Sequence, residues 1–163
     1  MKKRWFAVLF ALVLTGCGSR ETFETVSDVQ DAPVVAQAAK IQVSLPPEAA
    51  APAVQSDAGR LYLCGDYEIA IQTLTAGDLD ATIRSLCGYG REALTVLETQ
   101  REGIPCYSFV WTAMGEQGEQ VGRAAVLDDG THHYALTVLC DAETAGKHGP
   151  AWQDLFSSFR IAP

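Results

Sequence analysis

The chain has 163 residues, of which 48% are hydrophobic and 20% are charged, as expected for one globular domain and not for a disordered chain. Its formal net charge is −8 at pH 7, and it becomes −11 when a signal segment carrying Lys2, Lys3 and Arg4 is removed, because nine basic residues then face 20 acidic ones. Such a surface repels phosphate groups, which excludes nucleic acid as a partner and adhesion to anionic lipid by charge. The negative charge is compatible with cations and positively charged proteins as partners.

The N-terminus has the pattern of an export signal. Three basic residues, Lys2 to Arg4, precede a short apolar run at residues 5–14 that cannot span a bilayer. The sequence Leu14-Thr15-Gly16-Cys17 follows, and it resembles the lipobox of bacterial lipoproteins. The resemblance implies cleavage before Cys17, attachment of diacylglycerol to its sulfur and usually acylation of the new amino group. The alternative is an ordinary signal peptide with an incidental cysteine.

A lipid on Cys17 makes the membrane a partner of the protein. Anchoring by two or more acyl chains is physically sensible, because each buried CH₂ contributes ~0.8 kcal/mol and one chain holds only marginally. We therefore expect a lipoprotein tethered outside the cytoplasm. Residue 18 is glycine and not aspartate, so nothing there resembles the inner-membrane retention signal of Gram-negative lipoproteins. The sequence is compatible with an anchor in either the cell membrane or the outer membrane.

Three regions follow from this pattern. Residues 1–16 are expected to be the signal peptide, residues 17–40 the lipidated cysteine and a flexible tether, and residues 41–163 a single domain. The tether is polar, with scattered valines and no sustained period, although a weak helix is the alternative. We expect the domain to be monomeric.

The first half of the domain shows strand and helix signals in order. Residues 41–45 alternate as a first strand that stops at two prolines, and the Ala- and Pro-rich residues 48–59 predict an exposed loop. Residues 61–64 and 67–73 flank Gly65-Asp66, a two-residue turn that favours a hairpin. A helix over residues 79–87 is then predicted, with Asp78 as its N-cap and Gly88 as its left-handed C-cap.

Four strands in a row are predicted between Ala93 and Cys140. They cover residues 94–99, 106–113, 121–127 and 131–139, and their short polar connections favour an antiparallel meander. The second strand places Tyr107, Phe109 and Trp111 on one face, which should meet the core. The third contains Gly122, a small residue that permits close packing. Asp128-Asp129-Gly130 supplies the last turn.

A second helix begins at Gly149-Pro150 and closes the domain. Its apolar stripe, at helical spacing, is expected to cover a face of the sheet and comprises Trp152, Leu155, Phe156 and Phe159. The fold class is therefore α+β: an antiparallel sheet, formed by an N-terminal hairpin and a four-stranded meander, covered by two helices.

This order of elements resembles the PsbP/Mog1-like fold over about residues 41–161. The likeness rests on the "Val-x-Leu-Pro" first strand, the helix from Leu79 to Gly88, the strand that contains Trp111, and the closing Leu155-Phe156-Ser157-Ser158-Phe159. Members of that superfamily mostly act as binding or assembly modules, which the resemblance implies here. No motif residue of a family site matches, so none is carried over.

Four cysteines remain after lipidation: Cys64, Cys87, Cys106 and Cys140. An even number in an exported chain permits two disulfides, in three possible pairings that the spacing does not decide. The alternative is four buried thiols that pack as small hydrophobic groups.

The three histidines are weak candidates for metal ligation. His132 and His133 are neighbours at the start of a strand and point to opposite faces, so both cannot bind one metal without a bulge. A composite site would join either of them with Cys140, Asp141 or His148. Exposed histidines at strand ends are the simpler reading, and we expect neither a metal nor a cofactor.

The function predicted from the sequence is a membrane-anchored extracytoplasmic binding or assembly module with a possible protein partner and no catalysis of its own. The alternative is an envelope metal-binding protein or enzyme that uses His132, His133 and His148 with a cysteine or aspartate. Gly88-Tyr89-Gly90-Arg91-Glu92-Ala93 superficially matches a dinucleotide-binding loop, but it follows a helix and precedes a strand, the reverse of the required order.

Overall fold

A computed structural model describes residues 36–115 and 118–162. The predicted signal peptide, Cys17 and most of the predicted tether lie outside these residues. Within them, no helix is long and apolar enough to cross a bilayer.

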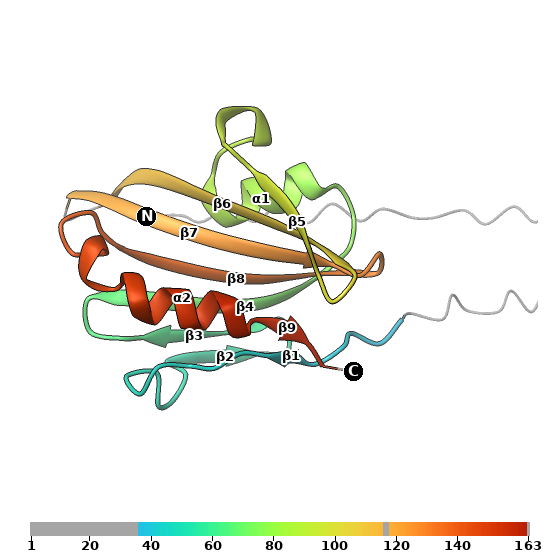
Figure 1. Cartoon of the computed structure of the whole chain (residues 1–163), viewed down its shortest axis with the longest axis horizontal. Helices are drawn as coiled ribbons and strands as arrows, with labels where there is room; N and C mark the ends of the chain where they lie inside the picture. Colours follow the sequence, from blue (N-terminus) through green and yellow to red (C-terminus); the bar gives the residue numbers. More distant parts are fainter. Residues whose placement is uncertain (1–35, 116–117, 163) are drawn as a thin grey trace, which may run out of the picture. The chain divides into compact units, whose positions relative to one another are not determined.

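A seven-stranded antiparallel sheet forms the centre of the domain (Figure 1). Its spatial order is β2-β3-β4-β8-β7-β6-β5, so the hairpin joins the meander through the pairing of β4 with β8. The strands are β2 (Val54–Ser56), β3 (Gly59–Leu63), β4 (Tyr67–Thr75), β5 (Leu97–Arg101), β6 (Ile104–Gly115), β7 (Gly118–Asp128) and β8 (His132–Asp141). The α+β fold with a hairpin and a four-stranded meander is confirmed.

The first predicted strand is shorter than expected and does not join the main sheet. Only β1 (Ile41–Gln42) forms, and it pairs with β9 (Arg160–Ile161) in a separate two-stranded sheet. Short β2 lies within the predicted loop at residues 48–59. β5 begins at Leu97, three residues later than predicted.

Both helices form as predicted. In α1 (Leu79–Cys87), the Asp78 side chain accepts a hydrogen bond from the Asp80 backbone N–H at 3.0 Å, and Gly88 ends the helix at φ 80°. α2 (Gly149–Ser158) begins with Gly149-Pro150. Two single 3₁₀ turns, η1 (Arg91–Ala93) and η2 (Ala145–Lys147), lie in the connections.

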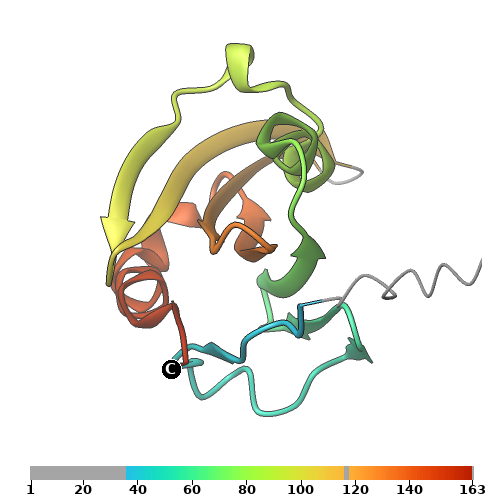
Figure 2. The same ribbon diagram turned by 90° about the vertical axis from the view of Figure 1, so that its right-hand side faces the viewer.

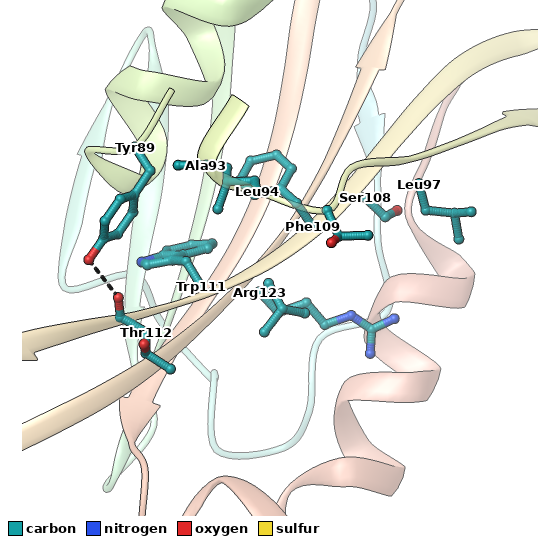
Figure 3. Close-up of a pocket in the computed structure, with 11 residues that line it drawn as sticks. Tyr89, Ala93, Leu94, Leu97, Ser108, Phe109, Trp111, Thr112 and Arg123 are labelled. Carbon is teal, nitrogen blue, oxygen red and sulfur yellow. Dashed lines mark hydrogen bonds between the residues drawn. The ribbon is translucent and has the colours of Figure 1, made fainter. Parts of the chain in front are cut away.

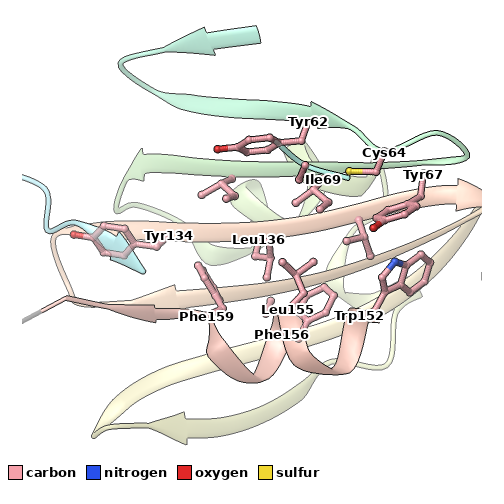
Figure 4. Packing of buried hydrophobic residues seen from close by; sticks show 14 of the residues in the cluster. Tyr62, Cys64, Tyr67, Ile69, Tyr134, Leu136, Trp152, Leu155, Phe156 and Phe159 are labelled. Atoms are coloured by element: carbon pink, nitrogen blue, oxygen red, sulfur yellow. The ribbon is translucent and has the colours of Figure 1, made fainter. Parts of the chain in front are cut away.

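Each helix covers its own face of the sheet. On the α2 face, buried side chains of α2 pack against alternate residues of β4 and β8 (Figure 4). The labelled members of this cluster are Tyr62, Cys64, Tyr67, Ile69, Tyr134, Leu136, Trp152, Leu155, Phe156 and Phe159. The prediction that the α2 stripe covers a sheet face is therefore confirmed.

The α1 face holds a second cluster. Ile83 of α1 is fully buried against Phe109 and Trp111 of β6 and against small residues of β7 and β8. The predicted aromatic face of β6 therefore does meet a core. Gly122 lies opposite Trp111, and a Cβ added to it would lie 2.1 Å from Trp111 Cζ2. The indole occupies the space that only glycine leaves free.

The domain begins slightly before residue 41. The Ala39 N–H donates a hydrogen bond to the Tyr134 hydroxyl at 2.9 Å, and the Lys40 carbonyl accepts from the Ala162 N–H at 2.7 Å. Ala39 also packs against the α2-face cluster. These two residues, assigned to the tether by composition, are thus contact residues of the folded domain.

Asp129 organises the turn between β7 and β8. Its carboxylate accepts hydrogen bonds from the Tyr134 hydroxyl at 2.7 Å, the His132 N–H at 2.6 Å and both the N–H and hydroxyl of Thr131 at 2.8 Å. Burial raises the pKa of this carboxyl, but the hydrogen bonds outweigh burial and lower the pKa from 3.8 to about 2.

We predict that Asp129 makes the domain acid-sensitive between about pH 4 and pH 2. Because the folded pKa lies below the unfolded one, the stabilisation is complete above pH 3.8 and is lost as the pH falls through 2. Urea unfolding of the wild type and Asp129→Asn at several pH values measures this. The stability difference between the two proteins should shrink over that window, and a pH-independent difference would contradict the assignment.

Candidate functional site

The candidate site is the free edge of β6. β5 pairs with β6 only between Leu97↔Ser108 and Arg101↔Ile104, whereas β7 pairs with β6 as far as Gly115. In the part of the chain that the structure describes, residues 109–115 of β6 therefore have no strand beside them on the β5 side. The reason is local: residues 88–96 arch away from the sheet through η1 before the chain joins it at Leu97 (Figure 2).

Backbone polar groups of this edge point away from β7. The Thr112 carbonyl accepts a hydrogen bond from the Tyr89 hydroxyl at 2.8 Å, on the side opposite β7 (Figure 3). Since successive residues of an antiparallel strand alternate the direction of their backbone groups, those of Val110 and Met114 point the same way. No strand pairs with these groups within the described residues. Such an edge is a template for another extended chain.

A groove of about 780 Å³ lies along this edge. Phe109 and Trp111 are buried in its floor, and Tyr89, Leu94 and Leu97 line its sides (Figure 3). Two apolar side chains that line it are largely in solvent, Leu97 at 62% and Val110 at 55% exposure, and Met114 further along β6 is 81% exposed. A volume of this size with a largely aromatic and aliphatic lining is typical of a ligand-binding site.

Arg123 is the cation of the groove. Arg123 belongs to β7 and pairs with Val110 of β6. Its guanidinium carbon is 4.4 Å from the centre of the Phe156 ring. Among the residues described, no carboxylate oxygen lies within 4.0 Å of this guanidinium. Its charge is therefore held by an aromatic face rather than by an acid, and is available to an anionic group of a ligand.

The structure does not bring the three histidines together. His132 and His133 begin β8, whereas His148 contacts Tyr67, which pairs with Cys140 near the other end of β8. At the rise of a strand, the two ends are about 25 Å apart. No group of three or more potential metal ligands occurs in residues 36–115 and 118–162. The composite site proposed from the sequence is not assembled here.

His148 has its own surroundings. Its ring centre lies 4.6 Å from that of Tyr67 and 5.8 Å from that of Trp152, and its Nε2 is 3.1 Å from Asp66 Oδ2. Burial is the main cause that raises the pKa of Tyr67 to about 12. This cluster fastens the β3–β4 turn to the start of α2.

His133 forms a contact that the sequence analysis missed. Its ring is fully buried, Thr82 Oγ1 lies 2.7 Å from its Nδ1, and Asp128 Oδ2 lies 3.7 Å from its Nε2. Hydroxyl, imidazole and carboxylate in a row is the order of a catalytic triad. Thr82 is nevertheless buried on the side of α1 that faces the sheet, and the carboxylate is beyond hydrogen-bond distance. None of the three residues lines the groove. The arrangement ties α1 to the sheet.

The four cysteines of the domain are free thiols, three of them buried. β4 separates Cys64 from Cys140, and β7 separates Cys106 from Cys140. Residues two strands apart are about 10 Å apart, beyond the ~7 Å that a disulfide spans. Burial raises the pKa of Cys64, Cys87 and Cys140, which makes them weak nucleophiles.

No family model and no curated protein matches this chain in sequence. Solved structures do match it in fold. A Bacteroides thetaiotaomicron structure has a TM-score of 0.52 at 8% identity; the match covers 76% of this chain and 45% of that one, so this chain spans less than half its length. The Ran-binding protein Mog1p of Saccharomyces cerevisiae has a TM-score of 0.51 at 10% identity, with 74% and 89% covered.

The cyanobacterial PsbP protein of Synechocystis is also similar. Its TM-score is 0.50 at 10% identity, and the match covers 82% of this chain and 99% of that one. The PsbP/Mog1-like fold predicted from the order of elements is therefore confirmed. At these identities the likeness establishes the fold alone.

Proposed function

We propose that this protein is a binding module held outside the cytoplasm by a lipid on Cys17, and that the groove beside β6 holds its protein partner. The observation that carries the proposal is the unpaired edge of β6 beside an apolar groove. Binding modules on this scaffold provide a precedent, since Mog1p is a Ran-binding protein.

Two features of the groove support binding over a structural role. The exposed Leu97 and Val110 line a hollow whose floor is aromatic, and the exposed Met114 lies further along the same edge of β6. Clustered exposed apolar groups mark interaction sites in soluble proteins. The outward backbone groups of β6 add hydrogen-bonding capacity to the same place. A partner that covers this edge shields the exposed apolar side chains from water and pairs with the free backbone groups of β6.

The anchor is supported by the sequence of the N-terminus. Lys2 to Arg4, the apolar run and Leu14-Thr15-Gly16-Cys17 occur in the order and spacing of a lipoprotein signal. The polar stretch that follows gives the domain reach from the membrane. The cell membrane and the outer membrane both fit this anchor.

Cys17→Ala should abolish membrane anchoring. The wild-type chain, expressed in a bacterium that processes lipoproteins, should incorporate a clickable fatty acid and enter the detergent phase of Triton X-114. The variant should do neither, because it lacks the sulfur that carries the lipid. Cys64→Ala is the matched control and should behave as wild type. Equal labelling of Cys17→Ala and wild type would contradict the anchor.

Site-specific crosslinking tests the groove. A photoreactive amino acid replaces Val110 in full-length protein in its native membranes, and another replaces Val54, an equally exposed strand valine at 58%. A discrete adduct is expected at position 110 and not at position 54. Leu97→Asp should weaken the adduct, whereas Leu63→Asp, on a residue 56% exposed and far from the groove, should not. Equal adducts at both positions would overturn the assignment.

A further inference from the structure

We propose that the partner binds by strand addition: an extended segment of another protein pairs with β6 from Val110 to Met114, with an acidic residue opposite Val110. This inference deepens the proposed function and rests on it. An extended chain is the one ligand that satisfies a row of alternating backbone donors and acceptors.

The backbone of β6 determines the shape of the ligand. The outward N–H and C=O groups of Val110 and Met114 and the N–H of Thr112 have no strand partner, while the Thr112 carbonyl is already held by Tyr89. The free segment runs from the end of the β5 pairing to Gly115, so it accepts about seven residues in line with β5. The added strand would extend the sheet in line with β5. Because the Tyr89 hydroxyl lies against the Thr112 carbonyl on this side, the Tyr89 side chain turns away when the strand binds.

The two faces of the sheet determine which side chains fit. Ligand residues opposite Trp111 and Ala113 point to the α1 face, where Leu94 and Tyr89 line the groove, so apolar side chains are favoured there. Ligand residues opposite Val110 and Thr112 point to the α2 face. Selectivity therefore alternates along the added strand.

On the α2 face, the positive charge of Arg123 determines which ligand side chain is favoured. Arg123 lies directly across β6 from the proposed strand, next to Val110, with no carboxylate within 4.0 Å in the described part of the chain. Its guanidinium lies over the Phe156 ring, and Arg123 itself lines the groove. A glutamate or aspartate opposite Val110 reaches over the short valine side chain to this cation, which identifies an acidic position in the ligand.

A second copy of this chain fits the edge less well. Symmetric antiparallel pairing of two free segments, each covering residues 109–115, would be centred on Thr112. Tyr89, which holds the Thr112 carbonyl, would then meet the Tyr89 of the other copy at the symmetry axis. A peptide has to displace one Tyr89 side chain, whereas a second copy has to displace two. The geometry thus favours a segment of a different protein.

The experiment selects seven-residue linear peptides from a displayed library on the full-length protein in detergent micelles. Enriched peptides should show apolar residues at alternate positions and one acidic residue between them. Arg123→Met should weaken their binding by about fivefold, the value of a partly exposed ion pair, and Arg60→Met, an exposed arginine on β3 that lies outside the groove, should leave it unchanged.

N-methylation of the selected peptide tests strand pairing without altering the protein. Methyl groups on the alternate amides that face β6 should each weaken binding by about tenfold, and methyl groups on the other amides should have little effect. The bound peptide should also slow hydrogen exchange of the Val110 and Met114 amides. A helical spacing of the essential residues, or equal sensitivity at every amide, would overturn strand addition.

Two outcomes separate this inference from the proposed function. Crosslinking of a partner at Val110 in membranes, with no periodic effect of N-methylation, would retain the binding site and reject strand addition. Protection of the Val110 and Met114 amides that rises with protein concentration in the absence of peptide would assign the edge to a second copy and overturn the proposal.

Discussion

Gly122→Ala should lower the free energy of unfolding by about 1–3 kcal/mol, the usual effect of overpacking a core. The added methyl would lie 2.1 Å from Cζ2 and 2.2 Å from Cε2 of Trp111, so the indole must move. Trp111 is part of both the α1-face cluster and the floor of the groove. Urea unfolding followed by circular dichroism measures the loss of stability.

Two variants make the cause of that loss testable. Gly77→Ala is the matched control, because nothing lies within 4 Å of its added Cβ, and it should be neutral or slightly stabilising. Trp111→Leu should make the Gly122→Ala change less costly than it is in the wild type, since the clashing ring is absent. If Gly122→Ala is as harmless as Gly77→Ala, the close approach of β7 and the indole is wrong.

Phe159→Ala should be among the most damaging substitutions, with a loss of about 3–5 kcal/mol. Phe159 follows α2 directly and is fully buried in the α2-face cluster. The Arg101 guanidinium donates hydrogen bonds to the carbonyls of Phe156 and Phe159, which fixes the end of α2 against β5. The cavity left by the ring therefore lies where the helix is anchored to the sheet.

Equilibrium unfolding in urea compares Phe159→Ala with Met114→Ala, whose side chain is 81% exposed. The control should change stability by less than about 0.5 kcal/mol, as exposed positions usually do. A loss for Phe159→Ala as small as that for Met114→Ala would contradict the burial of Phe159 in the α2-face cluster.

Elements with local signals could be predicted from the sequence. Asp78 and Gly88 determine the ends of α1 through their own hydrogen bond and backbone conformation, so no distant residue is needed to place them. The alternation of Phe109 and Trp111 with Ser108 and Val110 likewise predicted which face of β6 is buried. Periodicity carries this information because side chains of a strand alternate.

Features that depend on distant pairing could not be predicted. Ile41 pairs with Ile161, 120 positions away, and nothing in residues 41–45 indicates that partner. The start of β5 at Leu97 depends on where residues 88–96 rejoin the sheet, and the apolar pattern at Leu94 and Val96 is equally compatible with strand or loop packing. That difference of three residues leaves the edge of β6 free, so the candidate site was invisible to pattern analysis.

The buried contact of His133 was hidden for the same reason. A histidine at a strand start reads as exposed, and only the position of α1 over the sheet brings Thr82 to within 2.7 Å of its ring. The groove itself combines residues from the loop after α1, from β5, β6 and β7. Their proximity is a consequence of tertiary packing and not of spacing in the chain.

Single-residue amide hydrogen exchange on the full-length protein, without any partner, tests the free edge of β6 most directly. The account predicts alternation: Val110 and Met114 amides, which point away from β7, should exchange more than about 100-fold faster than those of Phe109, Trp111 and Ala113, which bond to β7. Equal strong protection along residues 109–114 would mean that the edge is already covered, and would contradict the site proposed for the partner.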